Sequence, residues 1–309
     1  FSRMLDDCYE SRDQQERIHQ RGQELSKTAK TVKDRLQRKL QQQEQEYAAT
    51  QSREQYRIYG DLITANLYRM QRGERTLRTE NFYADNAMTE VTLDPLLTPQ
   101  QNAARYYKLY NKAKTAEKVL AEQIEKACRE RDYLESVLQE LQQAELEQDF
   151  LDIRQELQQA GYLRGGKEKK QARRSSKPRV FYSSAGLRIL VGRNNQQNDQ
   201  LTLREADKND LWFHAQKIHG SHVILCIEGK LPDQKSVEEA AELAAFYSQG
   251  RDGGQMAVDY TPVRQVKKPS GARPGMVIYR SCQTVYVTPD AAKVKALTEK
   301  HESEKSGDR

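Results

Sequence analysis

The 309-residue chain has few apolar residues and no long apolar run. Only 36% of its residues are hydrophobic, and the mean hydropathy is -0.96. Two compact cores of this combined length would need more apolar side chains, so we expect part of the chain to be extended. No apolar run approaches the roughly 20 residues that cross a bilayer, so we expect no membrane-spanning segment.

Paired cysteines and the common enzyme motifs are also missing. The four cysteines, Cys8, Cys128, Cys226 and Cys282, are scattered without a CxxC pair. This excludes a disulfide-rich secreted scaffold and favours reduced thiols in a cytoplasmic protein. The chain lacks GxxxxGK[ST], GxGxxG and GxSxG, so it has neither of the common phosphate-binding loops nor a hydrolase nucleophile elbow.

Two long stretches almost free of Gly and Pro predict extended helices. Residues 1 to about 72 carry apolar residues at helical steps, and residues 99 to 160 carry a heptad seam that slips in register before a second run. The first pattern is Leu25, Ala29, Val32 and Leu36. The seam is Leu120, Ile124, Ala127, Arg131, Leu134, Leu138 and Leu141, and the second run is Leu146, Phe150, Ile153 and Leu157. Gly161 then ends the helix.

The segment between these helices, at residues 76–99, alternates β-favouring residues around an Asp-Asn turn, which predicts a hairpin. A short insert between two helices can reverse the chain. We therefore expect residues 1–160 to form a long antiparallel coiled coil, with a small tip insert at about 61–98. The alternative is a parallel dimer through the same seam.

Residues 161–178 read as a basic linker. From Arg164 to Arg193 there are ten Lys or Arg residues and one acid, Glu168. A solvated tether explains the conformation of such a segment. Its charge also suits contact with RNA phosphates, and the two interpretations are compatible.

From residue 179 onward, short strand-like runs surround one clear helix at 236–249, for which Ser236 is the expected N-cap. The pattern predicts a compact α+β domain with a largely antiparallel sheet over residues 179–290. Residues 291–309 read as a frayed, charged tail.

The stretch DLWFHAQKIHGSHVIL, residues 210–225, holds three histidines and the only tryptophan. A zinc site from His214, His219, His222 and Cys226 has unfavourable spacing, and Ser221 beside His222 offers adjacency without catalytic geometry. Two interpretations remain open. In one, Trp212 and His214 are polar neighbours of a strand whose other face is core. In the other, they stack on RNA bases beside phosphate-binding Lys217, Arg188 and Arg193.

Several motifs together resemble a known family. RNNQQND at 193–199, DLWFHA at 210–215, GSHVIL at 220–225 and VDYTPVRQVKKPSGARPGMVIY at 258–279 are similar to the RNA-binding module of the NFACT family. Upstream, GDLITANLY and LDPLLTPQQNAARYYKLYNKAK resemble the middle coiled coil of that family and its tip. The resemblance covers nearly the whole chain in the family's order.

The resemblance implies a ribosome-associated quality control factor in the cytoplasm. Such factors bind obstructed large ribosomal subunits and tRNA or peptidyl-tRNA, and support mRNA-independent C-terminal alanine tailing. The coiled-coil tip would meet 23S rRNA and stalk-base proteins. The protein would be a tRNA-positioning factor without a cofactor, metal or catalytic residue of its own, because the ribosome performs peptidyl transfer. The expected RNA-binding residues are Arg188, Arg193, Asn194, Asn195, Trp212, His214, Lys217, Gly220, Ser221, His222, Lys267 and Lys268.

Two departures from the family limit what the resemblance carries over. His219 stands where the family commonly has Pro, so it inherits no role. The family's N-terminal module and its Asp-Arg tRNA-contact motif are missing, and the chain opens at Phe1, so we expect a piece of a longer protein. The alternatives from other functional classes are a fibronectin-binding surface adhesin and a histidine- or metal-dependent nuclease.

Overall fold

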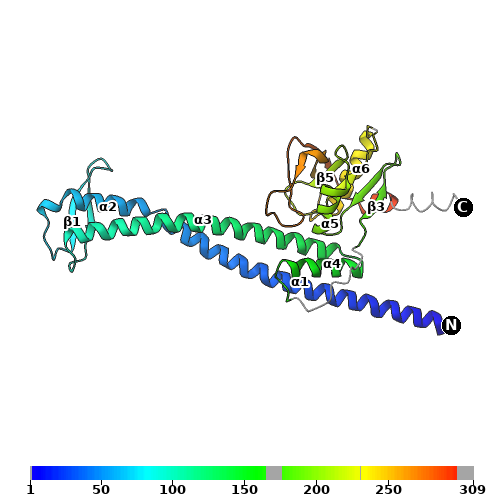
Figure 1. The fold of residues 1–309 in the computed structure, drawn as a ribbon, viewed down its shortest axis with the longest axis horizontal. Helices are drawn as coiled ribbons and strands as arrows, with labels where there is room; N and C mark the ends of the chain where they lie inside the picture. Colours follow the sequence, from blue (N-terminus) through cyan, green and yellow to red (C-terminus); the bar gives the residue numbers. More distant parts are fainter. Residues whose placement is uncertain (1, 165–175, 230, 298–309) are drawn as a thin grey trace. The chain divides into compact units, whose positions relative to one another are not determined.

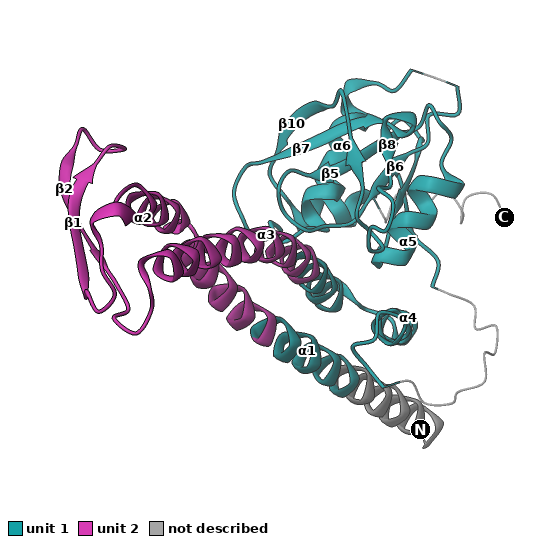
Figure 2. Cartoon of the chain, turned by 60° about the vertical axis from the view of Figure 1, so that its left-hand side comes forward, with its two compact units in different colours: residues 1–34, 132–309 teal, residues 35–131 magenta. Residues whose placement is uncertain are grey.

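The computed structural model describes residues 2–164, 176–229 and 231–297, with residues 2–19 as helix backbone alone. The core of the predicted linker, the end of the predicted tail and the Cys8 side chain lie outside the described parts. The chain divides into two compact units, coloured separately in Figure 2. Unit 1 comprises residues 1–34 and 132–309, and unit 2 comprises residues 35–131.

Unit 2 is built on antiparallel helices. It contains the second part of α1 (Ser2–Thr50), α2 (Arg53–Ala65), the short 3-10 helix η1 (Leu67–Arg69) and most of α3 (Pro99–Gln143). Gln43 of α1 donates a hydrogen bond to Gln123 of α3 at 2.7 Å, and Arg53 of α2 pairs with Glu117 of α3. Partners later in the first segment thus meet partners earlier in α3, which gives an antiparallel arrangement. Buried side chains line it: Leu36, Leu40, Leu120 and Ala127.

The far end of unit 2 holds the predicted hairpin. Strands β1 (Thr76–Asn81) and β2 (Ala87–Thr92) pair antiparallel, with Thr76 opposite Thr92. Asp85 and Asn86 adopt positive φ angles of 44° and 56°, which Asp and Asn tolerate better than most residues. A small core fixes the hairpin on the helices: Leu62, Ile63, Met70, Leu77, Val91, Leu93 and Ala103.

In unit 1 the second predicted helical stretch is two helices, because α3 ends at Gln143 and α4 spans Glu147–Gln159. The slip in the sequence pattern is therefore a helix break. Leu146 has extended backbone angles and a half-exposed side chain, so its assignment to the second apolar run was wrong. The Asp149 carboxylate accepts the backbone N–H groups of Glu145 and Leu146 and starts α4. Gly161, with φ of 85°, follows the end of α4.

The C-terminal part of unit 1 is an α+β fold around a fully antiparallel six-stranded sheet in the order β10-β7-β5-β6-β4-β3. Figure 1 labels β3, β5, α5 and α6 in this part of the chain. The strands are β3 (Arg179–Tyr182), β4 (Arg188–Val191), β5 (Leu211–Ala215), β6 (Val223–Leu225), β7 (Met256–Pro262) and β10 (Gln283–Val287).

Both faces of this sheet are buried. Helix α6 (Gln234–Phe246) packs on one face against Ile189, Phe213, Val223 and other apolar residues. The opposite face carries Trp212 and Ile224, and it is covered by four short elements and their connections. These elements are α5 (Asn195–Gln200), the π-helix η2 (Leu201–Glu205), the 3-10 helix η3 (Val263–Gln265) and the two-stranded sheet of β8 (Val266–Lys267) and β9 (Ile278–Tyr279).

Two boundary predictions for this fold were wrong. Helix α6 begins earlier than expected, because Asp233 is its N-cap and accepts the backbone N–H of Ser236. Residues 291–297 are helical, and Val294 and Leu297 are buried in the α6-side core, so this part of the tail is not frayed. Two apolar side chains one turn apart suffice to hold the segment against the core.

Every helix in the parts of the chain that the structure describes is too short or too polar to cross a membrane. Cys128, Cys226 and Cys282 carry free thiols.

Candidate nucleic-acid interface

The motif RNNQQND forms the turn from β4 into α5. Asn194 has extended backbone angles, and its side-chain oxygen accepts the backbone N–H of Gln197 at 2.8 Å, so it is the N-cap of α5. The Gln197 side chain accepts the backbone N–H of Arg193 in return. The motif thus specifies a helix start, and it buries Asn194 and Asn195 instead of presenting them to a ligand.

The motif GSH holds α5 against the sheet. Ser221 donates its hydroxyl to the carbonyl of Gly192 at 2.7 Å, and the backbone N–H of His222 donates to the side chain of Asn198 at 3.0 Å. A Cβ atom on Gly192 would lie 2.0 Å from Asn198 Oδ1, so only glycine fits there. Gly220 forms a bridge to Ser248, which a side chain would also obstruct. Ser221 and Gly220 are therefore structural residues in this arrangement.

Trp212 is fully buried, so the prediction that it offers a stacking face to RNA was wrong. The His214 ring stacks on it with centroids 5.6 Å apart, the His222 ring meets it edge-on at 5.2 Å, and Tyr279 covers a further side at 4.9 Å. Because β5 has covering elements on both faces, no side of the indole is left for a base. The interpretation of Trp212 and His214 as neighbours on one strand face is the one that this packing supports.

The two histidines of this cluster are neutral at physiological pH. Burial lowers the pKa of His214 to about 4 and that of His222 to about 3. His222 Nδ1 also lies 2.8 Å from the Thr202 hydroxyl. Neutral, packed imidazoles do not attract phosphate, so neither ring adds a positive charge beside the predicted phosphate contacts of Lys217, Arg188 and Arg193.

His219 contacts helix α3. Its Nε2 atom lies 3.7 Å from Glu135 Oε2 on α3, and the other oxygen of that carboxylate lies 3.7 Å from Lys33 Nζ on α1. The residue that departs from the family pattern therefore lies beside the helices of unit 1.

Arg193 is held in an internal ion pair. Its guanidinium lies 3.2 Å from the buried Asp149 carboxylate of α4 and donates to the carbonyl of Lys177 at 2.9 Å. Its side chain is 14% exposed. Asn195 similarly donates to Ser136 and Glu156. Both residues join the sheet domain to α3 and α4, and these internal contacts occupy the groups that were predicted to bind RNA.

The remaining predicted residues are basic. Arg188, Lys217 and Lys267 are exposed, and Lys217 adopts a positive φ of 60° at the turn after β5. Lys268 is ion-paired with Asp199 of α5, so its charge is partly neutralised. Of the twelve predicted residues, three exposed cations are thus available to phosphate.

Sequence reasoning missed further cations in the same region. Between Asp259 and Asp290 the chain has five basic residues and no acid: Arg264, Lys267, Lys268, Arg273 and Arg280. Arg264 and Arg280 are exposed, whereas Arg273 lies over the rings of Tyr133 and Tyr162. The absence of acids over 30 residues was the signal that could have identified them.

Four of the exposed cations, Arg188, Arg264, Lys267 and Arg280, lie on the side of the sheet opposite α6. Arg188 and Leu190 alternate with Ile189, and Leu190 packs with the Trp212 cluster, so Arg188 belongs to that face. Arg264, Lys267 and Arg280 belong to the segment that covers the same face. On α6 the charged side chains include Glu238, Glu239 and Glu242. Helix α6 also carries Lys235, and the opposite side includes Asp199 of α5 and Glu205 of η2, so both sides have charges of both signs. We call the exposed cations Arg188, Arg264, Lys267 and Arg280 the basic side of the sheet domain, because three of them belong to the acid-free segment and together they suit a polyanion.

The described residues give no support for metal or pocket chemistry. Within them, no three His, Cys, Asp or Glu side chains are arranged to hold a metal ion. Cys226, the fourth candidate zinc ligand, carries a buried free thiol.

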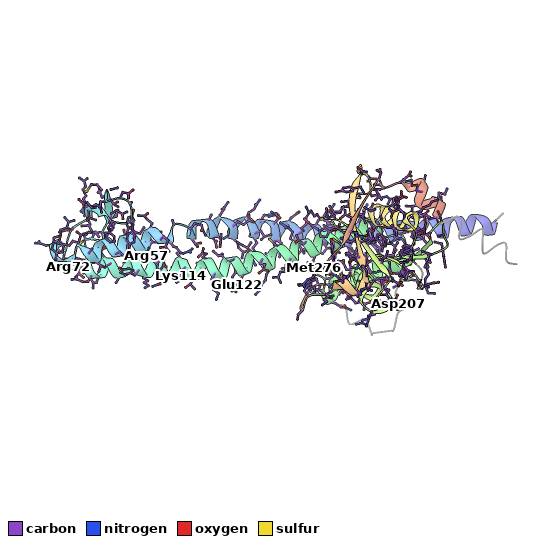
Figure 3. The ribbon with its side chains drawn as sticks, turned by 90° about the horizontal axis from the view of Figure 1, so that it is seen from above. Arg57, Arg72, Lys114, Glu122, Asp207 and Met276 are labelled. Carbon is purple, nitrogen blue, oxygen red and sulfur yellow. The ribbon has the colours of Figure 1, made fainter. Side chains whose placement is uncertain are left out.

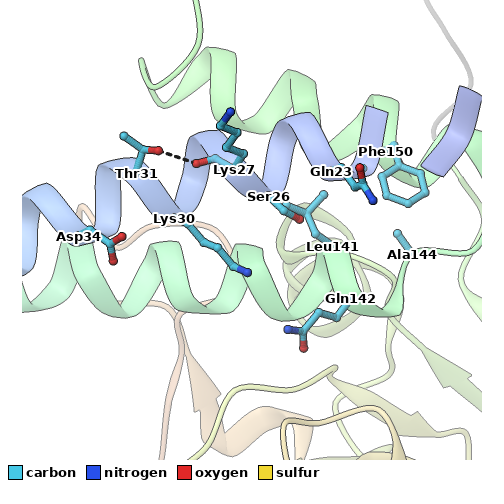
Figure 4. Close-up of a pocket in the computed structure, with 11 residues that line it drawn as sticks. Gln23, Ser26, Lys27, Lys30, Thr31, Asp34, Leu141, Gln142, Ala144 and Phe150 are labelled. Carbon is cyan, nitrogen blue, oxygen red and sulfur yellow. Dashed lines mark hydrogen bonds between the residues drawn. The ribbon is translucent and has the colours of Figure 1, made fainter. Parts of the chain in front are cut away.

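A groove of about 690 Å³ lies between α1 and the α3–α4 junction, with Lys27, Lys30 and Phe150 in its lining (Figure 4). It contains none of the twelve predicted residues.

Comparison with known proteins identifies two matching family models. The model described as NFACT N-terminal and middle domains matches residues 1–176. The model described as NFACT protein RNA binding domain matches residues 177–281, which include the basic side of the sheet domain.

Two curated relatives and one solved structure are similar to the chain. The Rqc2 homolog RqcH of Bacillus subtilis is 37% identical over 301 residues, and that of Streptococcus pneumoniae D39 is 38% identical over 298 residues. The alignments cover 96% of this chain and 52% and 53% of those proteins, so the chain spans about half their length. The C-terminal part of the fibronectin/fibrinogen-binding protein from Streptococcus suis matches with a TM-score of 0.72 at 34% identity, covering 91% of this chain and 99% of that one.

Proposed function

The chain belongs to the NFACT family, and from this premise we propose that it is the ribosome- and RNA-binding part of a ribosome quality control factor. The observation that carries the proposal is the acid-free basic segment between Asp259 and Asp290, most of which falls within the match to the family's RNA-binding domain. Exposed cations without acids attract phosphates independently of base sequence. The assignment to ribosome quality control is supported by the similarity to two proteins named Rqc2 homolog RqcH.

In this proposal the sheet domain binds tRNA through Arg188, Lys217, Arg264, Lys267 and Arg280. Lysine and arginine contacts to phosphate position an RNA without reading its sequence. Such contacts would suit a factor that accepts tRNA on a large subunit obstructed by peptidyl-tRNA. The chemistry of alanine tailing would remain with the ribosome, and the protein would act in the cytoplasm as a positioning factor without catalytic residues.

The helices and the tip of unit 2 would extend the binding surface. We propose that α1 and α3 form an intramolecular antiparallel coiled coil, consistent with the Gln43–Gln123 and Arg53–Glu117 contacts. The tip exposes several large apolar side chains, which favours a protein partner such as a stalk-base protein beside 23S rRNA. These side chains are Tyr68, Phe82, Tyr83, Met88 and Leu96.

The test is co-sedimentation of the chain with purified large subunits, with and without bound peptidyl-tRNA, over a salt series. We expect preferential pelleting with the obstructed subunit, weakening as salt rises. In parallel, tRNA affinity is measured for R264Q/K267Q/R280Q. Removing three phosphate contacts should lower the slope of log K against log salt by about 2.

A matched control removes three lysines from the α6 side. K235Q/K293Q/K295Q makes the same change in net charge on the opposite side, so it should leave the salt slope nearly unchanged. Equal loss in both variants, or tRNA binding that does not respond to either, would reject the basic side as the RNA site.

A second candidate function is fibronectin binding by a surface adhesin. The similarity to the Streptococcus suis fibronectin/fibrinogen-binding protein favours it. Binding of the chain to immobilised fibronectin separates the two candidates. Saturable binding that survives both R264Q/K267Q/R280Q and an excess of tRNA would support the adhesin, and its absence would remove that candidate.

A further inference from the structure

Two glutamates are buried where α3 and α4 meet the first turn of α5. Glu140 of α3 is 7% exposed and Glu156 of α4 is 2% exposed, and the charge of Glu156 acts on Glu140. The Glu156 carboxylate accepts hydrogen bonds from the Tyr133 hydroxyl at 2.8 Å and from the Asn195 amide at 3.3 Å. Because Asn195 belongs to α5, the pair lies at the contact between the helices and the sheet domain.

Within the described residues, no cation forms an ion pair with either carboxylate. Glu156 Oε2 and both oxygens of Glu140 have no hydrogen-bond partner there. Three charged groups of the sheet domain surround the pair. Asp199 of α5 raises the pKa of Glu156 and is itself paired with Lys268, and Arg273 lies over the ring of the tyrosine that donates to Glu156. The pair is therefore not neutralised by a direct contact with a positive charge.

Two carboxylates in one buried site cannot both ionise without a large cost. Burial raises the pKa of Glu156 to about 7. Burial, together with the charge of Glu156, raises the pKa of Glu140 well above its ordinary value of 4.5. The pair therefore holds at least one proton at neutral pH and begins to lose protons near pH 7. Once both groups are charged, an arrangement that admits water to them is favoured.

The contact between the helices and the sheet domain is polar. Within the described residues, neither apolar core of the sheet domain includes a side chain of α3 or α4. Besides the Arg193 ion pair, the backbone N–H of Ser176 donates to Asp152 at 2.9 Å, and Arg179 donates to the carbonyl of Gln143 at 2.8 Å. Water can replace contacts of this kind at modest cost. A domain contact without an apolar core can therefore separate while both sides stay folded.

We propose that Glu140 and Glu156 form a proton-dependent switch, which keeps the sheet domain docked on α3 and α4 while the pair is protonated and releases it when both carboxylates are charged. In the released form water surrounds both groups, so their pKa values return towards 4.5. The docked form thus binds protons more tightly. The contribution of the pair to docking is complete below about pH 4.5 and is lost as the pH rises through about 7, by about tenfold per pH unit for each released proton.

The experiment measures the distance between Cys282 of the sheet domain and a cysteine introduced at Gln142 of α3, at pH 6 and at pH 8. Q142C is made in a C8S/C128S chain, so nitroxide labels attach to two exposed thiols, whereas Cys226 is buried. Pulsed electron paramagnetic resonance then gives the distance distribution. We expect one narrow population at pH 6 and a second, broader population at pH 8, with an unchanged circular dichroism spectrum.

The variant E140Q/E156Q removes both ionisations and keeps the shape of the side chains. Its distance distribution should be the same at pH 6 and pH 8. If circular dichroism shows that this variant does not fold, E140Q alone makes the comparison. Glu156 then ionises without a like charge beside it, so the second population at pH 8 should be smaller than in the wild type. A wild-type distribution that ignores pH, or an equal response in the wild type and the folded variant, would overturn the proposal.

E122Q/E125Q is the matched control, because it removes two exposed acids that lie about 20 Å or more along α3 from Glu140. Figure 3 labels Glu122 on this helix. The control should respond to pH as the wild type does. Loss of the response in this variant would make the net charge of α3 the cause, and would reject the buried pair.

His219 also crosses the contact, through Glu135 of α3, so H219Q is a second control. It should keep most of the response to pH, and loss of the response would assign the switch to the histidine instead. A loss of helical signal at the pH where the second population appears would mean unfolding, and would also reject the switch. Since no RNA is present, these results are independent of the proposed function, which the inference goes beyond.

Discussion

Arg193 Nη1 lies 3.2 Å from Asp149 Oδ2, and the Asp149 side chain has no exposed surface. The pair connects the turn before α5 with the first turn of α4, where the same carboxylate accepts two backbone N–H groups. Arg193, which the sequence predicts to contact RNA, thus forms an internal ion pair that joins two elements of unit 1.

Replacing Arg193 by Gln should destabilise the fold by about 3 kcal/mol, because it leaves a buried carboxylate without its cation. The measurement is the free energy of unfolding in urea. R188Q, which removes an exposed arginine from the same domain, should cost less than about 0.5 kcal/mol. Wild-type stability of R193Q together with lost tRNA affinity would restore Arg193 as a direct RNA contact.

Gly192 gives a prediction about close packing. G192A should destabilise the domain by about 1 to 3 kcal/mol, because the new Cβ would lie 2.0 Å from Asn198 Oδ1 and displace the bond from that oxygen to the His222 backbone. G254A is the control, since nothing lies within 4 Å of a Cβ there. Equal urea midpoints for the two variants would contradict the role of the Gly192–Asn198 contact.

The sequence predicts the elements of this fold better than it predicts the roles of the residues in the motifs RNNQQND and DLWFHA. Helices, hairpin and strands follow from periodicity and turn residues, and these local signals are strong in this chain. The functions of Arg193, Asn195 and Trp212 depend on α4 and β9, which approach them from distant parts of the chain. No local pattern reveals such contacts, so buried polar residues were taken for ligand contacts. The exposed Arg264 and Arg280 needed only the charge pattern and could have been found.

Because the pKa of Glu156 is raised, we expect the folded state to lose stability as the pH rises. Burial raises its pKa to about 7, although hydrogen bonds from Tyr133 and Asn195 favour the charged carboxylate. The folded state therefore binds a proton more tightly than the unfolded chain does. The resulting stabilisation is complete below about pH 4.5 and is lost as the pH rises through about 7, a change on the order of 3 kcal/mol.

E156Q tests this pH dependence. The amide keeps an oxygen that can accept from Tyr133 and removes the ionisation, so the difference in unfolding free energy between pH 5 and pH 8 should shrink. Burial also raises the pKa of Glu140, so part of the difference should remain. An unchanged pH profile in E156Q would show that Glu156 does not titrate in this range.

Because the pKa values of His214 and His222 are lowered, we expect the folded state to lose stability as the pH falls. His214 and His222 have pKa values lowered to about 4 and about 3, so the unfolded chain binds their protons more tightly. Their contribution is complete above about pH 6.5 and is lost as the pH falls through 4. H222Q should be less stable at pH 7 but should lose less stability between pH 7 and pH 4 than the wild type does. A parallel loss in both proteins would contradict a neutral, buried His222.

Trp212 provides a direct optical test of the proposed RNA surface, because it is the only tryptophan in the chain. Its indole is fully buried between His214, His222 and Tyr279, so its fluorescence should be that of an apolar environment. Saturating tRNA should leave the emission maximum unchanged, because phosphate contacts by Lys267 and Arg280 do not require the indole to move. Stacking on a base would instead quench or shift the emission.

W212F should be less stable, since it removes part of a packed ring system, yet its folded fraction should bind tRNA with nearly the wild-type affinity. A quenched Trp212 combined with weaker binding by W212F would mean that the covering segment opens and that the base-stacking interpretation is correct.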